Sequence, residues 1–219
     1  MEITRMVWLF PLLILTACQG KSLSGTAASG DVPTEWTFNF FTPNALPAVV
    51  TFAAILDADG QDYRFNTLNY TSDLPGVIGE WNNKDRAPGG YWNHVKRPPR
   101  VIIFCWDSII DKKVYETHLT IPKPILEKML RPSEYKDYRG GTAYYNRMQI
   151  GLAPQGKVAV WLQGSGSEPN YRVTPSVVKT VSGNELNICI GITRFSKGYE
   201  YGKDTEDFIK GKNYPYGNW

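Results

Sequence analysis

The stretch Val101-Ile-Ile-Phe-Cys-Trp106 is a continuous apolar run rich in strand-forming residues. Such a run is typical of a β-strand that lies in the middle of a sheet and is buried on both faces. The segment Lys113–Leu119 alternates apolar and polar side chains, and only a short segment near 108–112 separates it from the first run. We therefore predict that the two segments pair through a tight turn at the centre of the fold.

Further strand-like segments lie on both sides of this pair, at 36–40, 49–56, 63–68, 148–152, 157–162, 171–179 and 186–194. Asp59-Gly60 and Gln155-Gly156 stand between such segments and predict the turns of two hairpins. Residues 122–131 have proline near the start and an apolar face, which predicts one short amphipathic helix. The expected fold class is β-rich (α+β): an antiparallel sandwich or barrel-like domain of seven to nine strands with one packed helix.

Composition supports a globular body and argues against nucleic acid as a partner. Apolar residues make up 42% of the 219 residues, aromatic residues 13%, and the formal net charge is only +3. A modest, mixed charge lacks the basic excess that a nucleic-acid surface needs. The chain is long enough for one domain with a sizeable core, which we expect over residues 35–219.

The N-terminus resembles the signal segment of a bacterial lipoprotein. Met6–Cys18 is an apolar run too short to cross a bilayer, and it ends in Leu-Thr-Ala-Cys like a lipobox. The resemblance implies cleavage after residue 17, lipid on Cys18, and a flexible tether over 18–34. Gln19 follows the cysteine, which implies the outer membrane, with the body facing the periplasm. An ordinary signal peptide with a chance cysteine is the alternative.

Two other cysteines, Cys105 and Cys189, lie in apolar segments. An oxidising compartment favours a disulfide between them. Two buried thiols on neighbouring core strands account for the sequence as well, so both readings stay open.

Residues 74–100 form an irregular stretch rich in glycine and proline that carries Trp81, Tyr91, Trp92 and His94. Aromatic side chains on a long loop can bind a protein partner, or they can fasten the loop to the core. The basic pair Lys96-Arg97 can contact an acidic partner or phosphate headgroups, or it can be solvated at the start of a strand.

The order and spacing of several motifs resemble the proteobacterial lipoproteins grouped as domain of unknown function 2931. These motifs are Pro99–Ser108, Tyr115 followed by a proline-led helix, and Ile150-Gly-Leu-Ala-Pro-Gln-Gly156 with Val160-Trp-Leu-Gln-Gly164. The resemblance brings no catalytic residues. Genes of this family often neighbour type VI secretion lipase effectors, which implies an immunity protein by association.

Catalytic patterns are not found in the sequence. The two histidines, His94 and His118, have no nucleophile elbow to serve, and no metal-binding spacing is present. We expect no enzyme activity, no cofactor and no metal. The predicted function is an outer-membrane lipoprotein that binds and blocks a toxic lipase effector. The alternative is an envelope lipoprotein with a structural or stress role and no toxin partner.

Overall fold

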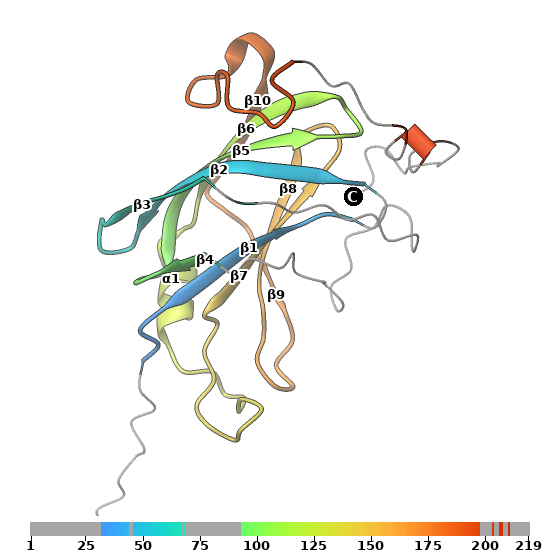
Figure 1. Ribbon diagram of the computed structural model, residues 1–219. Helices are drawn as coiled ribbons and strands as arrows, with labels where there is room; N and C mark the ends of the chain where they lie inside the picture. Colours follow the sequence, from blue (N-terminus) through green and yellow to red (C-terminus); the bar gives the residue numbers. More distant parts are fainter. Residues whose placement is uncertain are drawn as a thin grey trace, which may run out of the picture.

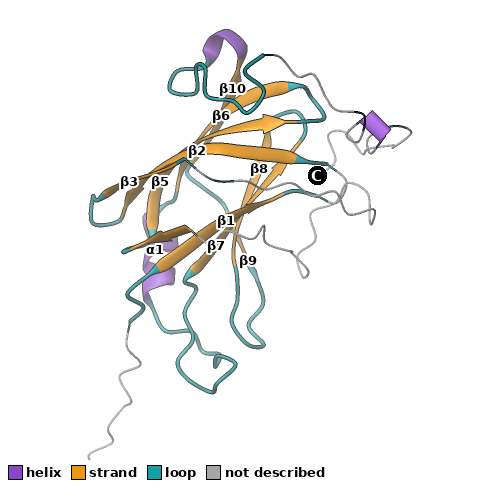
Figure 2. Cartoon of the chain, in the orientation of Figure 1, coloured by secondary structure: helices purple, strands orange, loops and turns teal. Residues whose placement is uncertain are grey.

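The computed structural model describes residues 32–43, 46–66, 68, 93–197, 203, 206, 207 and 210. Two five-stranded sheets face each other across an apolar core, with one short helix at the side (Figures 1 and 2). The predicted signal segment, Cys18, most of the predicted tether and the aromatic residues Trp81, Tyr91 and Trp92 lie outside the described residues. No helix within the described ranges is both long and apolar enough to span a bilayer.

The predicted central pair is confirmed. β5 (Pro99–Ser108) pairs with β6 (Lys113–Thr120) over eight residue pairs, from Val101↔Thr120 to Ser108↔Lys113. β5 also pairs on its other side with β2 (Ala48–Asp57). The sheet is completed at its edges by β3 (Asp62–Phe65) next to β2 and β10 (Val177–Ser182) next to β6.

The second sheet has the order β4-β1-β7-β8-β9. Its strands are β1 (Trp36–Phe41), β4 (Asn93–Val95), β7 (Arg147–Ala153), β8 (Lys157–Leu162) and β9 (Tyr171–Val173). β1 and β7 run parallel, whereas the other pairs are antiparallel. The three-residue turn from β7 to β8 has φ of 66° at Gln155 and 71° at Gly156, the left-handed conformation that glycine adopts readily.

Large side chains from alternate strand positions fill the space between the sheets. The ring centres of Phe40 and Phe104 lie 4.9 Å apart, and those of Trp106 and Tyr115 lie 4.7 Å apart. The buried indole of Trp106 donates to Thr117 Oγ1 at 3.0 Å, so its polar atom is satisfied inside the core. The sheets remain open at their edges, so the fold is a sandwich and not the barrel that the sequence also allowed.

The predicted helix is confirmed as α1 (Lys123–Leu130). Pro124 stands in its first turn, where a missing N–H costs nothing. Ile125, Leu126 and Met129 are buried against the sandwich.

Two strand predictions are wrong. The segment 171–179 is not one strand, because it divides into β9 and β10 around Pro175, which has no N–H to continue a ladder. The segment 186–194 is not a strand either: a 3-10 turn at Gly183–Glu185 precedes turns and bends. β4 is a strand that the sequence did not predict, which brings the described strands to ten.

Candidate functional site

Of the four predicted partner-binding residues, the structure describes His94. It lies on β4, the edge strand that pairs with the beginning of β1. Its side chain is 54% exposed, and its Nδ1 lies 3.3 Å from Glu35 Oε2. His94 is therefore accessible at the sheet edge beside the point where the chain enters the sandwich.

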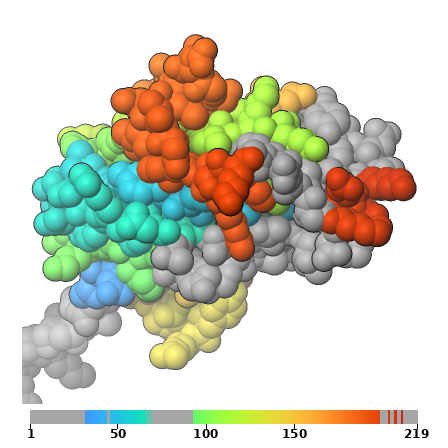
Figure 3. Space-filling model, turned by 45° about the horizontal axis from the view of Figure 1, so that its top comes forward, coloured from blue at the N-terminus to red at the C-terminus, as the bar shows by residue number. Residues whose placement is uncertain are grey.

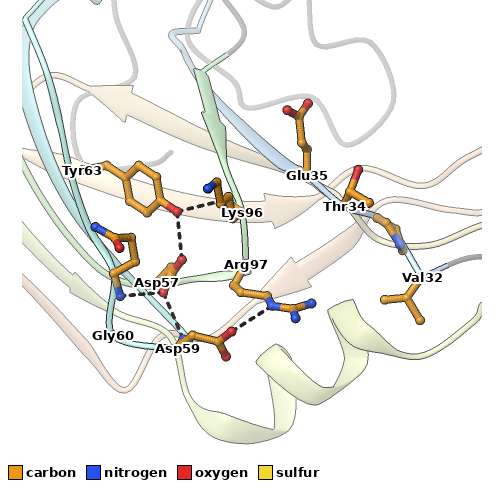
Figure 4. A pocket seen from close by; sticks show the side chains of 11 residues that line it. Val32, Thr34, Glu35, Asp57, Asp59, Gly60, Tyr63, Lys96 and Arg97 are labelled. Carbon is orange, nitrogen blue, oxygen red and sulfur yellow. Dashed lines mark hydrogen bonds and ion pairs between the residues drawn. The ribbon is translucent and has the colours of Figure 1, made fainter.

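A groove of about 810 Å³ lies at this entrance. We call it the hairpin groove, and its lining residues are Val32–Glu35, Asp57, Asp59, Gly60, Gln61, Tyr63, Lys96 and Arg97. Figure 4 shows the three contributing parts: the segment before β1, the turn between β2 and β3, and the connection from β4 to β5. Segments far apart in the sequence thus form one surface.

Asp57 holds the hairpin groove together. The whole residue is 1% exposed, and its carboxylate accepts the backbone N–H groups of Asp59 at 3.0 Å and Gln61 at 2.9 Å. It also accepts the hydroxyl of Tyr63, whose oxygen in turn accepts the N–H of Lys96 at 3.2 Å. One carboxylate therefore shapes the predicted Asp59-Gly60 turn and, through Tyr63, fixes it to the β4–β5 connection.

The rim of the hairpin groove carries exposed charges of both signs. Arg97 Nε contacts Asp59 Oδ2 at 2.9 Å, and the two side chains are 44% and 65% exposed. An exposed ion pair of this kind contributes only about 0.2–1 kcal/mol, so each member can exchange its partner for a group on another protein at little cost. The rim of the groove is therefore polar, and its charged side chains are accessible.

A second surface, missed by the sequence reasoning, follows α1. Lys128 Nζ lies 5.0 Å from the ring centre of Tyr145 and 4.7 Å from that of Tyr171. After the end of α1, the chain forms a projecting turn at Tyr135–Arg139, which we call the tyrosine tip. Tyr135 is 42% exposed and Tyr138 is 84% exposed.

Hydrogen bonds and close packing hold the turn of the tyrosine tip in place. Asp137 Oδ1 accepts the N–H of Arg139 at 2.8 Å and of Gly141 at 2.7 Å. A Cβ on Gly166 would lie 2.3 Å from Lys136 O, so the 163–170 loop packs directly against the tip. The tyrosines are presented on a braced turn.

The segment 183–195 crosses the outer face of the β5–β6 pair, and we call it the strap (orange in Figure 3). Cys189 is bonded to Cys105 of β5, with the sulfurs 2.00 Å and the Cα atoms 5.5 Å apart. Of the two readings left open by the sequence, the structure has the disulfide. Its partner cysteine lies on the strap and not on a core strand.

Two buried carboxylates bind the backbone of the strap. Glu116 accepts the N–H groups of Asn187 at 2.8 Å and Cys189 at 3.0 Å, and it contacts His118 Nε2 at 2.6 Å. Asp107 accepts the N–H of Arg194 at 2.9 Å and the hydroxyl of Thr193 at 2.7 Å. Both carboxylates therefore stabilise the position of the strap on β5 and β6.

Burial by itself would raise the pKa of Glu116. Hydrogen bonds from the N–H of Cys189, from His118 and from the N–H of Asn187 outweigh burial and hold the pKa below its usual range. The folded protein therefore keeps this carboxylate ionised although its side chain is 1% exposed.

Metal binding finds no support in the described ranges, which contain no group of three or more His, Cys, Asp or Glu side chains arranged to hold an ion. The absence of enzyme activity stays a prediction. The described surface has two features that stand out, the hairpin groove and the exposed tyrosine tip.

Residues 24–217 match the profile of the family described as "Protein of unknown function (DUF2931)". The chain belongs to this family. The resemblance that the sequence motifs indicated is thereby confirmed over nearly all of this DUF2931 chain. No curated protein and no solved structure matches it.

Proposed function

We propose that this DUF2931 protein is an outer-membrane lipoprotein whose sandwich binds and occludes a toxic lipase effector in the periplasm. The lipobox-like Leu-Thr-Ala-Cys18 supports the anchor. A disulfide between Cys105 and Cys189 suits an oxidising compartment. The family's gene neighbourhoods supply the association with lipase effectors.

The observation that carries the proposal is the position of the hairpin groove. Val32–Glu35, which comprise the described end of the predicted tether and the first residue of the body, form one of its walls. If Cys18 is lipidated, the groove is held close to the membrane on which a lipase acts. Attachment to the same membrane raises the effective concentration of the binding domain towards such an enzyme.

The mechanism is steric occlusion through polar contacts. Exposed His94, Lys96 and Arg97 stand on or beside the groove and can pair with acidic groups of the effector. Charges on a rim steer association and set specificity more than they set affinity. Aromatic residues of the partner-binding prediction, Trp81, Tyr91 and Trp92, would add the anchoring contacts.

The test is a competition between sibling strains, one bearing the type VI effector and one lacking the gene for this protein. We expect the wild-type gene to restore survival, and Cys18→Ser to restore it poorly. A Lys96→Glu/Arg97→Glu variant should protect less than wild type, whereas Lys113→Glu/Lys157→Glu, with the same change of net charge, should protect fully.

Equal survival with and without the gene would refute the immunity role. It would leave the alternative, an envelope lipoprotein in structural or stress work. Full protection by Cys18→Ser would refute the need for the anchor.

A further inference from the structure

The strands place the tyrosine tip at the same end of the sandwich as the tether. β1 and β7 are parallel, with Thr37 opposite Arg147, and Thr37 N donates to Asn146 O at 2.8 Å. The 131–146 loop therefore enters β7 at the end where the chain enters β1. In Figure 1 the start of β1 and this yellow loop lie together at the lower end, and in Figure 3 they again lie on the lower side.

The connection from β8 to β9 reaches the same end. β8 runs antiparallel to β7, with Leu162 opposite Met148, and Gln163 N donates to Arg147 O at 2.8 Å. The opposite end of this sheet is the Gln155-Gly156 turn, about 20 Å away at the rise of a β-strand. Lys113 and Lys157 line one shallow hollow at that far end.

The chemistry of the tip is that of a membrane interface. Two exposed tyrosines alternate with Lys136 and Arg139, both also exposed. Tyrosine rings prefer the headgroup level of a bilayer, and basic side chains beside them attract anionic lipid. The acidic Asp137 between them is turned inward to the backbone, where its Oδ1 accepts two N–H groups.

The other acidic groups nearby leave this balance in place. Glu168 is 8% exposed and accepts the hydroxyl of Ser133, and Glu127 contacts Lys123 and Arg131. Glu134 is the exposed carboxylate next to the tip. Lys136 and Arg139 therefore face solvent, whereas Asp137 is half-buried and Glu134 is the exposed acid beside them. The two basic side chains are free to contact anionic phospholipid headgroups.

We propose that the tyrosine tip is a membrane-docking surface that rests on anionic phospholipid and orients the sandwich. The inference rests on the proposed anchor at Cys18, since seventeen residue steps separate Cys18 from Glu35 and can span at most about 60 Å. That reach exceeds the length of the sheet, about 20 Å, so the anchor supplies proximity to the bilayer and the contacts of the tip would set the orientation. Docking would hold the hairpin groove at a fixed height above the lipid.

The experiment uses the full chain purified from its host and reconstituted in vesicles of phosphatidylethanolamine with phosphatidylglycerol. A single environment-sensitive dye is attached at Tyr138→Cys or, as a control, at Lys157→Cys, and nitroxide-bearing lipid serves as quencher. We expect strong quenching at position 138 and little at position 157. Closure of the Cys105–Cys189 bond in each variant is checked by mass.

Charge gives the second arm. With the dye at 138, Lys136→Glu/Arg139→Glu should lower the equilibrium constant for docking of the tip, by roughly fivefold for each basic side chain removed. The matched Lys113→Glu/Lys157→Glu variant should quench like the parent. Vesicles of phosphatidylcholine alone should quench the parent less than anionic vesicles do.

The mass of the purified chain separates the two proposals. An acylated chain with no quenching at 138, or with equal quenching at 138 and 157, would overturn the docking surface and keep the anchor. A chain without acyl groups that still quenches at 138 would overturn the anchor and keep the surface. A chain with neither acylation nor quenching would overturn both.

Discussion

Removing the disulfide tests how much the strap contributes to the sandwich. The perturbation is the double variant Cys105→Ala/Cys189→Ala, which cuts the covalent link between β5 and the strap. The bridge closes a loop with a sequence separation of 84 residues. The chain-entropy relation assigns about 4.5 kcal/mol at 25 °C to a loop of this size, because the unbridged unfolded chain gains that freedom.

The expected result is a loss of about 4 kcal/mol in the free energy of unfolding, measured by urea denaturation. For a domain of this size that corresponds to a fall of roughly 8–16 °C in Tm. Wild-type protein in reductant should match the variant, and reductant should leave the variant unchanged. The fold should survive, because Glu116 and Asp107 still bind the backbone of the strap.

A loss below about 1 kcal/mol would refute this reasoning. It would mean that the strap detaches before the sandwich unfolds, so that the bridge does not constrain the globally unfolded state. Hydrogen exchange at the amides of Asn187 and Cys189 distinguishes the two cases. Early exchange in the double variant, with the β5 amides still protected, would identify local detachment.

Three further substitutions test single contacts. Glu116→Gln should cost about 1–3 kcal/mol in the free energy of unfolding near pH 7. Because folding lowers the pKa of Glu116 from 4.5, the stabilisation by its carboxylate is complete above pH 4.5 and is lost as the pH falls through the folded-state pKa. Urea titrations in acid should therefore show the variant approaching the stability of wild type. Asp111→Ala should cost about 2–3 kcal/mol in thermal unfolding, since it leaves donors on Ser108, Tyr115 and Gln155 without their carboxylate; no loss would show that water replaces it. Gly166→Ala should destabilise more than Gly60→Ala, because both have positive φ but only Gly166 would meet backbone, at Lys136 O; equal losses would contradict the packing of the two loops.

Much of the sandwich could be predicted because local pattern and tertiary position agree there. The apolar run of β5 is buried in the middle of a sheet, and the Gln155-Gly156 turn adopts the left-handed conformation that its glycine favours. β4 could not be predicted, because three residues carry no periodicity and are ordered by pairing with β1. The hairpin groove could not be predicted for the same reason. Asp57 and Tyr63 join its parts by hydrogen bonds only when β2, β3 and the end of β4 come together.

The strap shows where a pattern misleads. Its Leu-Asn-Ile-Cys-Ile reads as a strand, yet Ile188 is 37% and Ile190 71% exposed while Cys189 is 1% exposed. The alternation is real but inverted, because the buried residue is the one that bonds Cys105. The N–H groups that a strand would give to a neighbour go instead to Glu116, whose position 71 residues earlier no local pattern can reveal.

The strap also explains why two acidic residues lie buried on the outer face of the central β5–β6 pair. An ionised carboxylate in a buried position is costly unless it is fully hydrogen-bonded. Glu116 and Asp107 meet this condition only when the strap lies across β5 and β6, so each carboxylate disfavours every arrangement in which the strap is elsewhere. The disulfide joins residues that the carboxylates also hold together. Glu116 and Asp107 bind the backbone of the strap at and beyond Cys189, so we expect removal of either carboxylate to lower the yield of the Cys105–Cys189 bond.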